Sequence, residues 1–478
     1  MARTYHVFDV VIIGAGSAGI SALREALKYT SNVVLVEKGE GGTTCAKTGC
    51  MPSKALIHAA KLYDSRKKFK EVGINGAEHL QADVPRILKK VREHRDHFVS
   101  SVKEGLESID HYIVRGVAKF ESPTCLRVDD KLYHTHRTII ATGSVPFIPK
   151  DFSAIPKERI ITSETLFELK DLPKRIGMVG LGPLGLEMAQ AIAKLDISVV
   201  AAHANTLLGG ISDADMNHEM QHVLAKNMKI HTNADASAEM KGNNIIFTVD
   251  GENYPVDALF LSAGRKPAIE ALGLRKLKVP MKDSGVPWFD PMTLQLPNLP
   301  IFMAGDVNDE RAILHEASLE GKTAAYNAVH HHGNGTQMDD DTNKATKKSK
   351  EKNGKRPTRY VPMNIIFTEP NIASVGASYD CLKGRKMIEV EASFENQGRA
   401  VVEQRNVGRI RLFLDADDCT LLGAELLAPE GEHIVHLLAL AIQQHMTATD
   451  LLKMPFYHPT FEEALRTALK RGVEKWSA

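Results

Sequence analysis

Short apolar runs that end in glycine alternate with longer amphipathic stretches in the first part of the chain. Asp9–Ile13 is an apolar run followed by Gly14, which is the pattern of a buried parallel strand. The next stretch, 17–29, predicts a helix, and Val33–Val36 predicts a second strand that closes with Glu37. The order of strand, helix and strand indicates a βαβ segment.

The same order returns once along the chain. A second βαβ segment begins at Arg175 and runs to about residue 203, and strand-like stretches at 245–249 and 256–263 are expected to continue it. Between the two segments the pattern predicts two long helices and a strand-rich stretch, at 52–69, 83–108 and 111–140.

The last third of the chain changes character twice. Residues 331–358 carry dense charge and almost no apolar side chain, which predicts a solvated loop or linker. Its basic half could instead be a docking patch, and its histidines could bind a metal. From about residue 360 a further domain is expected, with strands at 361–368 and 408–414 and apolar helices at 430–446 and 460–471.

Composition narrows the class of protein. The chain has 478 residues, 43% hydrophobic and 25% charged, with a formal net charge of +1. That length predicts about three domains, and the charge balance favours neither nucleic acid nor a membrane surface. The chain enters a strand almost at once, which leaves no room for a signal peptide. Five cysteines are too few for a secreted disulfide framework, so we expect a cytoplasmic protein.

The loop after the first strand is a dinucleotide fingerprint, Gly14-Ala-Gly-Ser-Ala-Gly19. Gly14 permits the tight turn, Gly16 lets a pyrophosphate approach the backbone, and Gly19 lets helix and strand pack closely. The helix N-terminus then holds the phosphate charge. Glu37 stands where a carboxylate can bind ribose hydroxyls, so this segment predicts a dinucleotide site.

A second fingerprint places glycine at Gly180, Gly182 and Gly185. At the end of its second strand stands His203, without the acid that selects an unphosphorylated ribose and without an arginine pair for a 2′-phosphate. Gly185 favours NAD mildly, but the choice between NAD and NADP stays open.

Cys45 and Cys50 are separated by four residues just after the first βαβ segment. A zinc half-site would need two more ligands with similar spacing, and the other cysteines stand singly, so no metal site is expected. Two inert buried thiols are a further alternative. A redox disulfide fits better, because Cys50 precedes Pro52, and a helix that begins there would stabilise a thiolate.

One further residue supports that chemistry. Lys54 lies one turn beyond Cys50, where a cation would stabilise negative charge on a flavin, although an ordinary surface lysine is the alternative. Cys45, further out in the loop, is the sulfur expected to exchange with substrate.

His458 and Glu463 form the third group. A thiol–disulfide enzyme needs a base for the incoming thiol, because the thiolate attacks. Histidine titrates in the right range, and Glu463, five residues on, can orient its ring. The alternative is a helix start with no catalytic role.

These motifs together resemble the class I pyridine-nucleotide–disulfide oxidoreductases, and within them most closely the dihydrolipoamide dehydrogenases. The resemblance covers nearly the whole chain. It rests on Gly14–Gly19, the stretch from Cys45 to Lys54, Ile140–Gly143, Gly180–Glu187, Ala263–Arg265, Ala304–Asp306 and His458–Glu463.

The resemblance implies an α/β fold with two Rossmann-like domains and a C-terminal α+β dimerisation domain. The implied boundaries are 1–150 for FAD, 151–270 for NAD(P), 271–330 for a return segment, 331–359 for the hydrophilic loop and 360–478 for dimerisation.

It also implies roles for single residues. Lys54 would pair with Glu187 beside the flavin, where the nicotinamide stacks. FAD would meet Gly14, Gly16, Gly19, Glu37, Thr44, Ala118, Thr142, Gly143, Asp306, Leu314 and His315. The nicotinamide nucleotide would meet Gly180, Gly182, Gly185, His203 and Gly264.

The implied activity is oxidation of a protein-bound dihydrolipoyl dithiol by NAD⁺, with electrons passing through the Cys45–Cys50 disulfide and FAD. The implied partners are a second copy of the chain, whose cysteines His458 and Glu463 would serve, and the lipoyl domain of a 2-oxo acid dehydrogenase-type complex. The alternatives are an NAD(P)H-dependent reductase of another small disulfide and a flavoprotein with a mainly binding role.

Overall fold

The computed structural model describes residues 6–330 and 359–478. These residues form two compact units, and the long helices α3 (Cys50–Asp64) and α4 (Val84–Glu107) contribute residues to both. The first unit comprises residues 1–52, 93–146 and 265–359, and the second comprises 53–92, 147–264 and 360–478. The predicted hydrophilic loop at 331–359 lies, except for its last residue, outside the described residues.

The first unit is built on a seven-stranded sheet in the order β3-β2-β1-β6-β5-β4, with β17 beside β6. The pairings among β3, β2, β1, β6 and β17 are parallel, whereas β4 and β5 extend the sheet as an antiparallel meander. The strands are β1 (Val7–Ile13), β2 (Val33–Glu37), β3 (Ile113–Arg115), β4 (Ala118–Ser122), β5 (Cys125–Val128), β6 (Lys131–Ile140) and β17 (Ile301–Met303).

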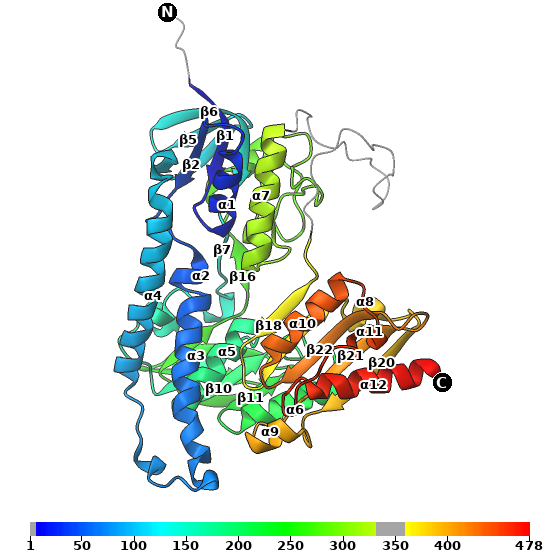
Figure 1. Cartoon of the computed structure of the whole chain (residues 1–478). Helices are drawn as coiled ribbons and strands as arrows, with labels where there is room; N and C mark the ends of the chain where they lie inside the picture. The colour runs from blue at the N-terminus through cyan, green and yellow to red at the C-terminus, as the bar shows by residue number, and fades with distance from the viewer. Residues whose placement is uncertain (1–5, 331–358) are drawn as a thin grey trace, which may run out of the picture. The chain divides into compact units, whose positions relative to one another are not determined.

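Two helices, α1 (Ser17–Ala26) and α7 (Leu314–His330), lie side by side in this unit (Figure 1). Gly321 makes the close approach possible, because a Cβ there would lie 2.1 Å from the carbonyl oxygen of Ala18. The unit also contains the short helix α2 (Thr44–Lys47) and a two-stranded ribbon of β7 (Ser144–Pro146) and β16 (Arg265–Pro267).

The second unit contains a five-stranded parallel sheet in the order β11-β10-β9-β15-β8. Its strands are β8 (Ile160–Ile161), β9 (Arg175–Val179), β10 (Ser198–His203), β11 (Lys229–Thr232) and β15 (Ala258–Leu261). Helix α5 (Pro183–Lys194) joins β9 to β10, and α6 (Ala214–Ala225) joins β10 to β11. The predicted second βαβ segment is therefore present.

One sequence-based expectation about this sheet is wrong. The stretch 245–249 does not continue it, because β13 (Asn244–Val249) belongs to a separate antiparallel sheet with β12 (Ala236–Lys241) and β14 (Glu252–Val256). The cause is local: Asp250 and Gly251 adopt positive φ angles of 48° and 84°, as a tight hairpin turn requires. Only the later part, β15, joins the parallel sheet.

The C-terminal part of the second unit is an antiparallel sheet in the order β18-β19-β22-β21-β20. Helix α10 (Gly431–Gln443) packs on β19 and β22, and α12 (Glu463–Ser477) packs on β20 and β21. The strands are β18 (Met363–Ile366), β19 (Asn371–Gly376), β20 (Met387–Ser393), β21 (Arg409–Asp415) and β22 (Leu421–Ala428), and the short helices are α8 (Tyr379–Leu382), α9 (Gly398–Val402) and α11 (Ala448–Leu451).

The predicted fold class is confirmed by the largely parallel sheet of each unit and by the C-terminal antiparallel sheet with its helices. The helix expected to reach residue 69 ends earlier, at Asp64, and the chain continues as a 3₁₀ helix, Ser65–Val72. That stretch is strongly polar (Ser-Arg-Lys-Lys-Phe-Lys-Glu-Val) and buries none of its side chains, so no packed face extends the α-helix.

No helix in the described parts of the chain has the length and apolar character to cross a membrane.

Candidate functional site

The loop between β1 and α1 is shaped by three glycines. Gly14 has a φ of +103°, and a Cβ there would lie 2.5 Å from the carbonyl oxygen of Ala141. A Cβ on Gly19 would lie 1.8 Å from the carbonyl oxygen of Gly14. Gly16, by contrast, has open space beside it. The first and third glycines therefore permit close packing, and the second leaves the backbone accessible to a ligand.

Glu37, at the end of β2, is fixed against this loop. Its Oε2 accepts the backbone N–H of Ala15 at 2.6 Å, and its Oε1 accepts that of Gly39 at 2.8 Å. These bonds hold the carboxylate beside the first turn of the fingerprint.

The residues just after β6, Thr142 and Gly143, have features that fit a bound dinucleotide. The hydroxyl oxygen of Thr142 is buried and has no hydrogen-bond partner among the described residues, which is unusual for a buried polar atom. Gly143, next to it, has a φ of +67° and open space beside it. A cofactor that offers a polar atom here would satisfy Thr142.

Asp306 opens a 3₁₀ turn, Asp306–Asn308, and is part-buried. Its carboxylate accepts the hydroxyl of Ser144 at 3.2 Å, and that hydroxyl accepts Arg265 Nε at 2.7 Å. The preceding amide, of Gly305, donates to Glu320 at 2.7 Å.

Sequence reasoning missed Glu320. Its side chain is fully buried and also accepts Asn308 Nδ2 at 2.7 Å and Arg359 Nη1 at 2.6 Å. The available signal was an acid one position before Gly321, in the helix α7.

The other residues expected near FAD stay predictions. Ala118 is buried at the start of β4, whereas Thr44 is exposed in α2. Leu314 and His315 open α7, and the leucine is exposed.

The second fingerprint repeats the geometry of the first. Gly180 has a φ of +90°, and a Cβ there would lie 2.4 Å from the carbonyl oxygen of Ser262. A Cβ on Gly185 would lie 2.1 Å from the carbonyl oxygen of Gly180, whereas Gly182 has open space. Gly264 also faces open space, with a φ of +116°. This loop fits a second dinucleotide by the same steric criteria.

His203 occupies in the second loop the place that Glu37 occupies in the first. Its Nδ1 accepts the backbone N–H of Leu181 at 3.2 Å, as Glu37 accepts that of Ala15. Burial lowers the pKa of His203 below its usual 6.5, so the imidazole is neutral at physiological pH and carries no charge to offer a ribose phosphate.

The two cysteines stand at the beginnings of successive helices in the first unit. Cys45 lies in α2, whose first turn is capped by Thr43, and Cys50 is the first residue of α3. Cys50 therefore has the position at which free backbone N–H groups stabilise a thiolate.

Lys54 and Glu187 form an ion pair in the second unit. Lys54 Nζ lies 3.0 and 2.9 Å from the two carboxylate oxygens of Glu187, which is buried in α5. Glu187 Oε1 also accepts the backbone N–H of Phe367 at 3.0 Å, and the ammonium lies 4.3 Å from the centre of the Phe367 ring. Three segments distant in sequence thus fix this pair.

His458 and Glu463 also come together in the second unit. His458 Nδ1 lies 3.0 and 3.1 Å from the two oxygens of Glu463, the first residue of α12. The hydrogen bond from His458 lowers the pKa of Glu463, so the carboxylate stays ionised and holds one ring nitrogen. The imidazole is 78% exposed, which leaves Nε2 accessible to a proton donor.

Two family models match successive parts of the chain. Residues 8–331 match pyridine nucleotide-disulphide oxidoreductase, and residues 362–469 match the dimerisation domain of the same family. The chain belongs to the pyridine nucleotide-disulphide oxidoreductases. The match to that family's dimerisation domain supports a homodimer.

Known relatives agree with this family. The chain is 30% identical to dihydrolipoyl dehydrogenase of Bacillus subtilis over 487 residues, which covers 97% of this chain and 96% of that protein. It is 26% identical to mercuric reductase of Lysinibacillus sphaericus, over 96% of this chain and 82% of that protein. The predicted family is therefore confirmed, and with it a flavoprotein that uses FAD and a nicotinamide nucleotide.

Two solved structures share the fold of this chain. The HOCl-induced flavoprotein disulfide reductase RclA from Escherichia coli superimposes with a TM-score of 0.80 at 22% identity, over 96% of this chain and 99% of that one. LpdA from Mycobacterium tuberculosis gives the same TM-score at 21% identity, over 97% of this chain and 99% of that one.

Proposed function

We propose that this protein is a dihydrolipoyl dehydrogenase, which oxidises a protein-bound dihydrolipoyl dithiol with NAD⁺ through a Cys45–Cys50 disulfide. The observation that carries the proposal is the contact of His458 Nδ1 with Glu463, because oxidation of a dithiol needs a base that can accept a thiol proton. The similarity to dihydrolipoyl dehydrogenase of Bacillus subtilis over almost the whole chain supports the choice of substrate.

The thiol steps follow from the chain's own residues. His458, held by Glu463, takes a proton from one substrate thiol, and the resulting thiolate attacks the Cys45 sulfur of the disulfide. The Cys45–Cys50 bond breaks as a mixed disulfide with Cys45 forms, and Cys50 leaves as a thiolate at the start of α3. The second substrate thiol then displaces Cys45, which yields the cyclic disulfide of the product and the reduced cysteine pair.

The cofactors supply what the side chains cannot. When bound, FAD and the nicotinamide nucleotide provide the two-electron acceptors that return the cysteine pair to the disulfide. The residues expected to hold FAD belong to the first unit, and the Gly180–Gly185 loop and His203 are expected to hold the nucleotide. Lys54, fixed by Glu187, would place a positive charge near the flavin ring.

The active unit is proposed to be a homodimer in which His458 and Glu463 serve the partner subunit's Cys45. The substrate would be a lipoyl domain of a 2-oxo acid dehydrogenase-type complex, and a cytoplasmic location stays a prediction. The separate boundaries of the FAD, NAD(P) and return segments are likewise proposed.

The first experiment is anaerobic turnover of the purified holoenzyme with dihydrolipoamide and NAD⁺, followed by NADH absorbance. We expect rapid NADH formation that is abolished in Cys45→Ser, because the serine cannot form the disulfide. The flavin content of the variant, measured by its absorbance, controls for lost cofactor.

The opposite result has a defined meaning. A flavin-loaded enzyme that produces no NADH would contradict the proposed substrate. If the same enzyme then reduces another small disulfide with NADPH, the alternative activity replaces it.

A further inference from the structure

Helix α5 carries a stripe of three buried polar side chains. Glu187, Gln190 and Lys194 are spaced three and four residues apart, so they lie on one face of the helix. They are only 5%, 5% and 8% exposed. Buried polar groups are costly unless they are paired, and each of the three finds its partner in the same short segment, 367–369.

Gln190 binds the backbone of that segment with both ends of its amide. Its Oε1 accepts the N–H of Glu369 at 2.8 Å, and its Nε2 donates to the carbonyl oxygen of Glu369 at 2.9 Å. This pair of bonds fixes the chain direction two residues after Phe367. The Phe367 amide is thereby directed at Glu187 Oε1, 3.0 Å away.

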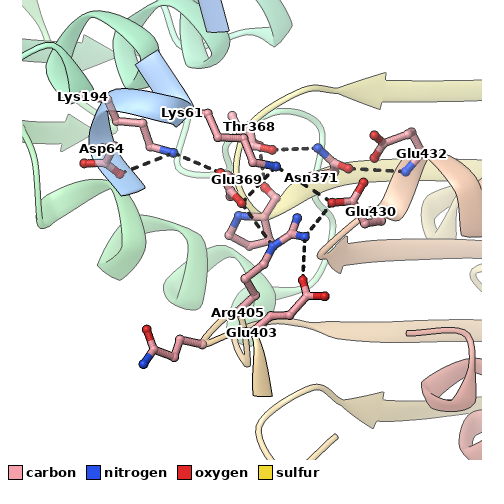
Figure 2. A network of polar contacts seen from close by, with 12 residues as sticks. Lys61, Asp64, Lys194, Thr368, Glu369, Asn371, Glu403, Arg405, Glu430 and Glu432 are labelled. Atoms are coloured by element: carbon pink, nitrogen blue, oxygen red, sulfur yellow. Dashed lines mark hydrogen bonds and ion pairs between the residues drawn. The ribbon is translucent and has the colours of Figure 1, made fainter. Parts of the chain in front are cut away.

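The side chain of Glu369 is held by cations from three elements (Figure 2). Its carboxylate lies 3.3 Å from Lys61 Nζ, 3.5 Å from Lys194 Nζ and 3.2 Å from Arg405 Nε. Burial opposes ionisation of Glu369, but the charges of Lys194, Lys61 and Arg405 outweigh it and hold its pKa below the usual 4.5.

The cations are themselves balanced by further acids. Arg405 pairs with Glu430 at 2.6 Å and Glu403 at 3.4 Å, and Lys194 lies 3.8 Å from Asp64 (Figure 2). A set of this kind is strongly destabilised when one member is removed. It therefore anchors Glu369 in one position.

The anchored segment and the Lys54–Glu187 pair line one cavity. Its volume is about 160 Å³, and its walls include Lys54, Glu187, Gln190, Phe367 and Glu369. The carboxylate of Glu187 lines this cavity and accepts hydrogen bonds from both the Lys54 ammonium and the Phe367 amide. A shift of Phe367 would remove the amide and let the pair rotate.

We propose that Gln190 and Glu369 are positioning residues, which hold the Phe367 amide against Glu187 and so fix the Lys54 ammonium for reaction with the nicotinamide nucleotide. The inference rests on the proposed role of Lys54 near the flavin, but not on the identity of the thiol substrate. This role connects residues 367–369, which follow β18, to the step in which the nicotinamide nucleotide reacts.

The test is Gln190→Leu, which keeps the side-chain volume and removes both hydrogen bonds. We expect faster hydrogen–deuterium exchange in peptides that cover 365–369 of the holoenzyme. After anaerobic reduction with dithionite, reoxidation by NAD⁺ should slow about 10- to 100-fold in limiting rate, because small misplacements of a reacting group have effects of that size. The half-saturating NAD⁺ concentration should change less than about threefold.

A double-mutant cycle separates positioning from a general loss of structure. In a Glu187→Gln background, Gln190→Leu should slow reoxidation no further, because the carboxylate through which it acts is gone. Glu425→Gln is the matched control: Glu425 is also a buried acid of the second unit, close to Arg411, but within the described parts of the chain it makes no hydrogen bond or ion pair with residues 367–369. It should leave both the exchange of 365–369 and the reoxidation rate unchanged.

Three results would overturn the proposal. Unchanged exchange at 365–369 in Gln190→Leu would show that the amide does not hold the segment. Faster exchange with a normal reoxidation rate would make the contact merely structural. An equal slowing in the Glu187→Gln background would show that Gln190 does not act through Glu187. Because dithionite replaces the thiol, failure of the proposed dihydrolipoyl activity would leave this test unaffected.

Discussion

At the scale of single residues, His458 shows how a common side chain becomes a candidate base. Glu463 accepts a hydrogen bond from one ring nitrogen and stands at the beginning of α12, where the helix N-terminus favours a carboxylate. The carboxylate on one side of the imidazole orients the ring, so that Nε2 faces away from Glu463. The exposed ring therefore has an orientation and a ready site for a proton.

Replacement of this base has a definite expected result. His458→Gln should lower turnover with dihydrolipoamide by about 10²–10⁴-fold, the usual contribution of a general base. Its flavin content and its reoxidation by NAD⁺ after dithionite reduction should be unchanged, since neither needs a thiol proton. Steady-state and stopped-flow absorbance measure the two rates, and normal dithiol turnover would remove His458 from the mechanism.

At the scale of elements, the two βαβ segments use the same design with one difference. In each, the first and third glycines pack closely and the second is open, and a side chain at the end of the second strand accepts the N–H that follows the first glycine. The first segment uses Glu37 for this bond and the second uses His203. A neutral imidazole can accept the N–H, but it cannot select a ribose hydroxyl over a phosphate by charge.

This difference predicts weak nucleotide selection and a way to strengthen it. His203→Glu should raise the preference for NAD⁺ over NADP⁺ by about 10- to 100-fold, because a charged hydrogen bond to the ribose contributes about 1.5–3 kcal/mol and the acid repels a 2′-phosphate. His203→Gln, which keeps a polar side chain without charge, is the control. The ratio of kcat/KM values for the two nucleotides measures the effect.

The pH dependence of that ratio follows from the lowered pKa of His203. The imidazole is neutral in the folded protein above about pH 6.5, so the wild-type ratio should stay constant between about pH 7 and about pH 8.5. Its contribution to stability is present above about pH 6.5 and is lost as the pH falls toward the lowered folded-state pKa, because the unfolded chain then binds the proton more tightly. A ratio that moves toward NADP⁺ as the pH falls from about 8.5 to about 7 would show that the ring is charged there.

At the scale of the whole molecule, the candidate groups are divided between parts of the chain. The cysteines and the first fingerprint belong to the first unit, and His458 with Glu463 belongs to the second. The family's dimerisation domain matches residues 362–469, which contain both His458 and Glu463. A site completed by a second copy of the chain is therefore a testable arrangement.

Subunit complementation tests it directly. Cys45→Ser and His458→Gln homodimers should both be nearly inactive with dihydrolipoamide, whereas a heterodimer purified through two different tags should recover about half of the wild-type activity. One of its two sites then combines Cys45 from one subunit with His458 from the partner subunit, and the other site carries both substitutions.

The control for complementation is a chain that carries both substitutions, paired with wild type. In that heterodimer each site lacks one group, so it should be as inactive as the single variants. Activity in this control without activity in the first heterodimer would show that both groups act within one chain.

The motifs that predict the chemistry of the chain are local features of its sequence. Close backbone approaches require glycine at Gly14, Gly19, Gly180 and Gly185, and a helix that begins at Cys50 needs only neighbouring residues. Features of this kind depend on a few consecutive positions, so pattern and spacing predict them, and the family follows from their order. The Asp250-Gly251 turn is equally local, and it is the feature that places the stretch 245–249 in a separate antiparallel sheet.

Only the tertiary structure decided which contacts hold the candidate site residues in place. Gln190 and Glu369 are 179 residues apart, and Glu320 meets Gly305 through the close packing of α7 on its neighbours. Gln190, Glu369 and Glu320 belong to none of the motifs, because a buried hydrogen bond is specified by where two distant segments meet and not by the sequence around either one. The sequence by itself predicted which groups react; the packing of distant segments decided how firmly each is held, since burial turns an ordinary amide or carboxylate into a fixed constraint.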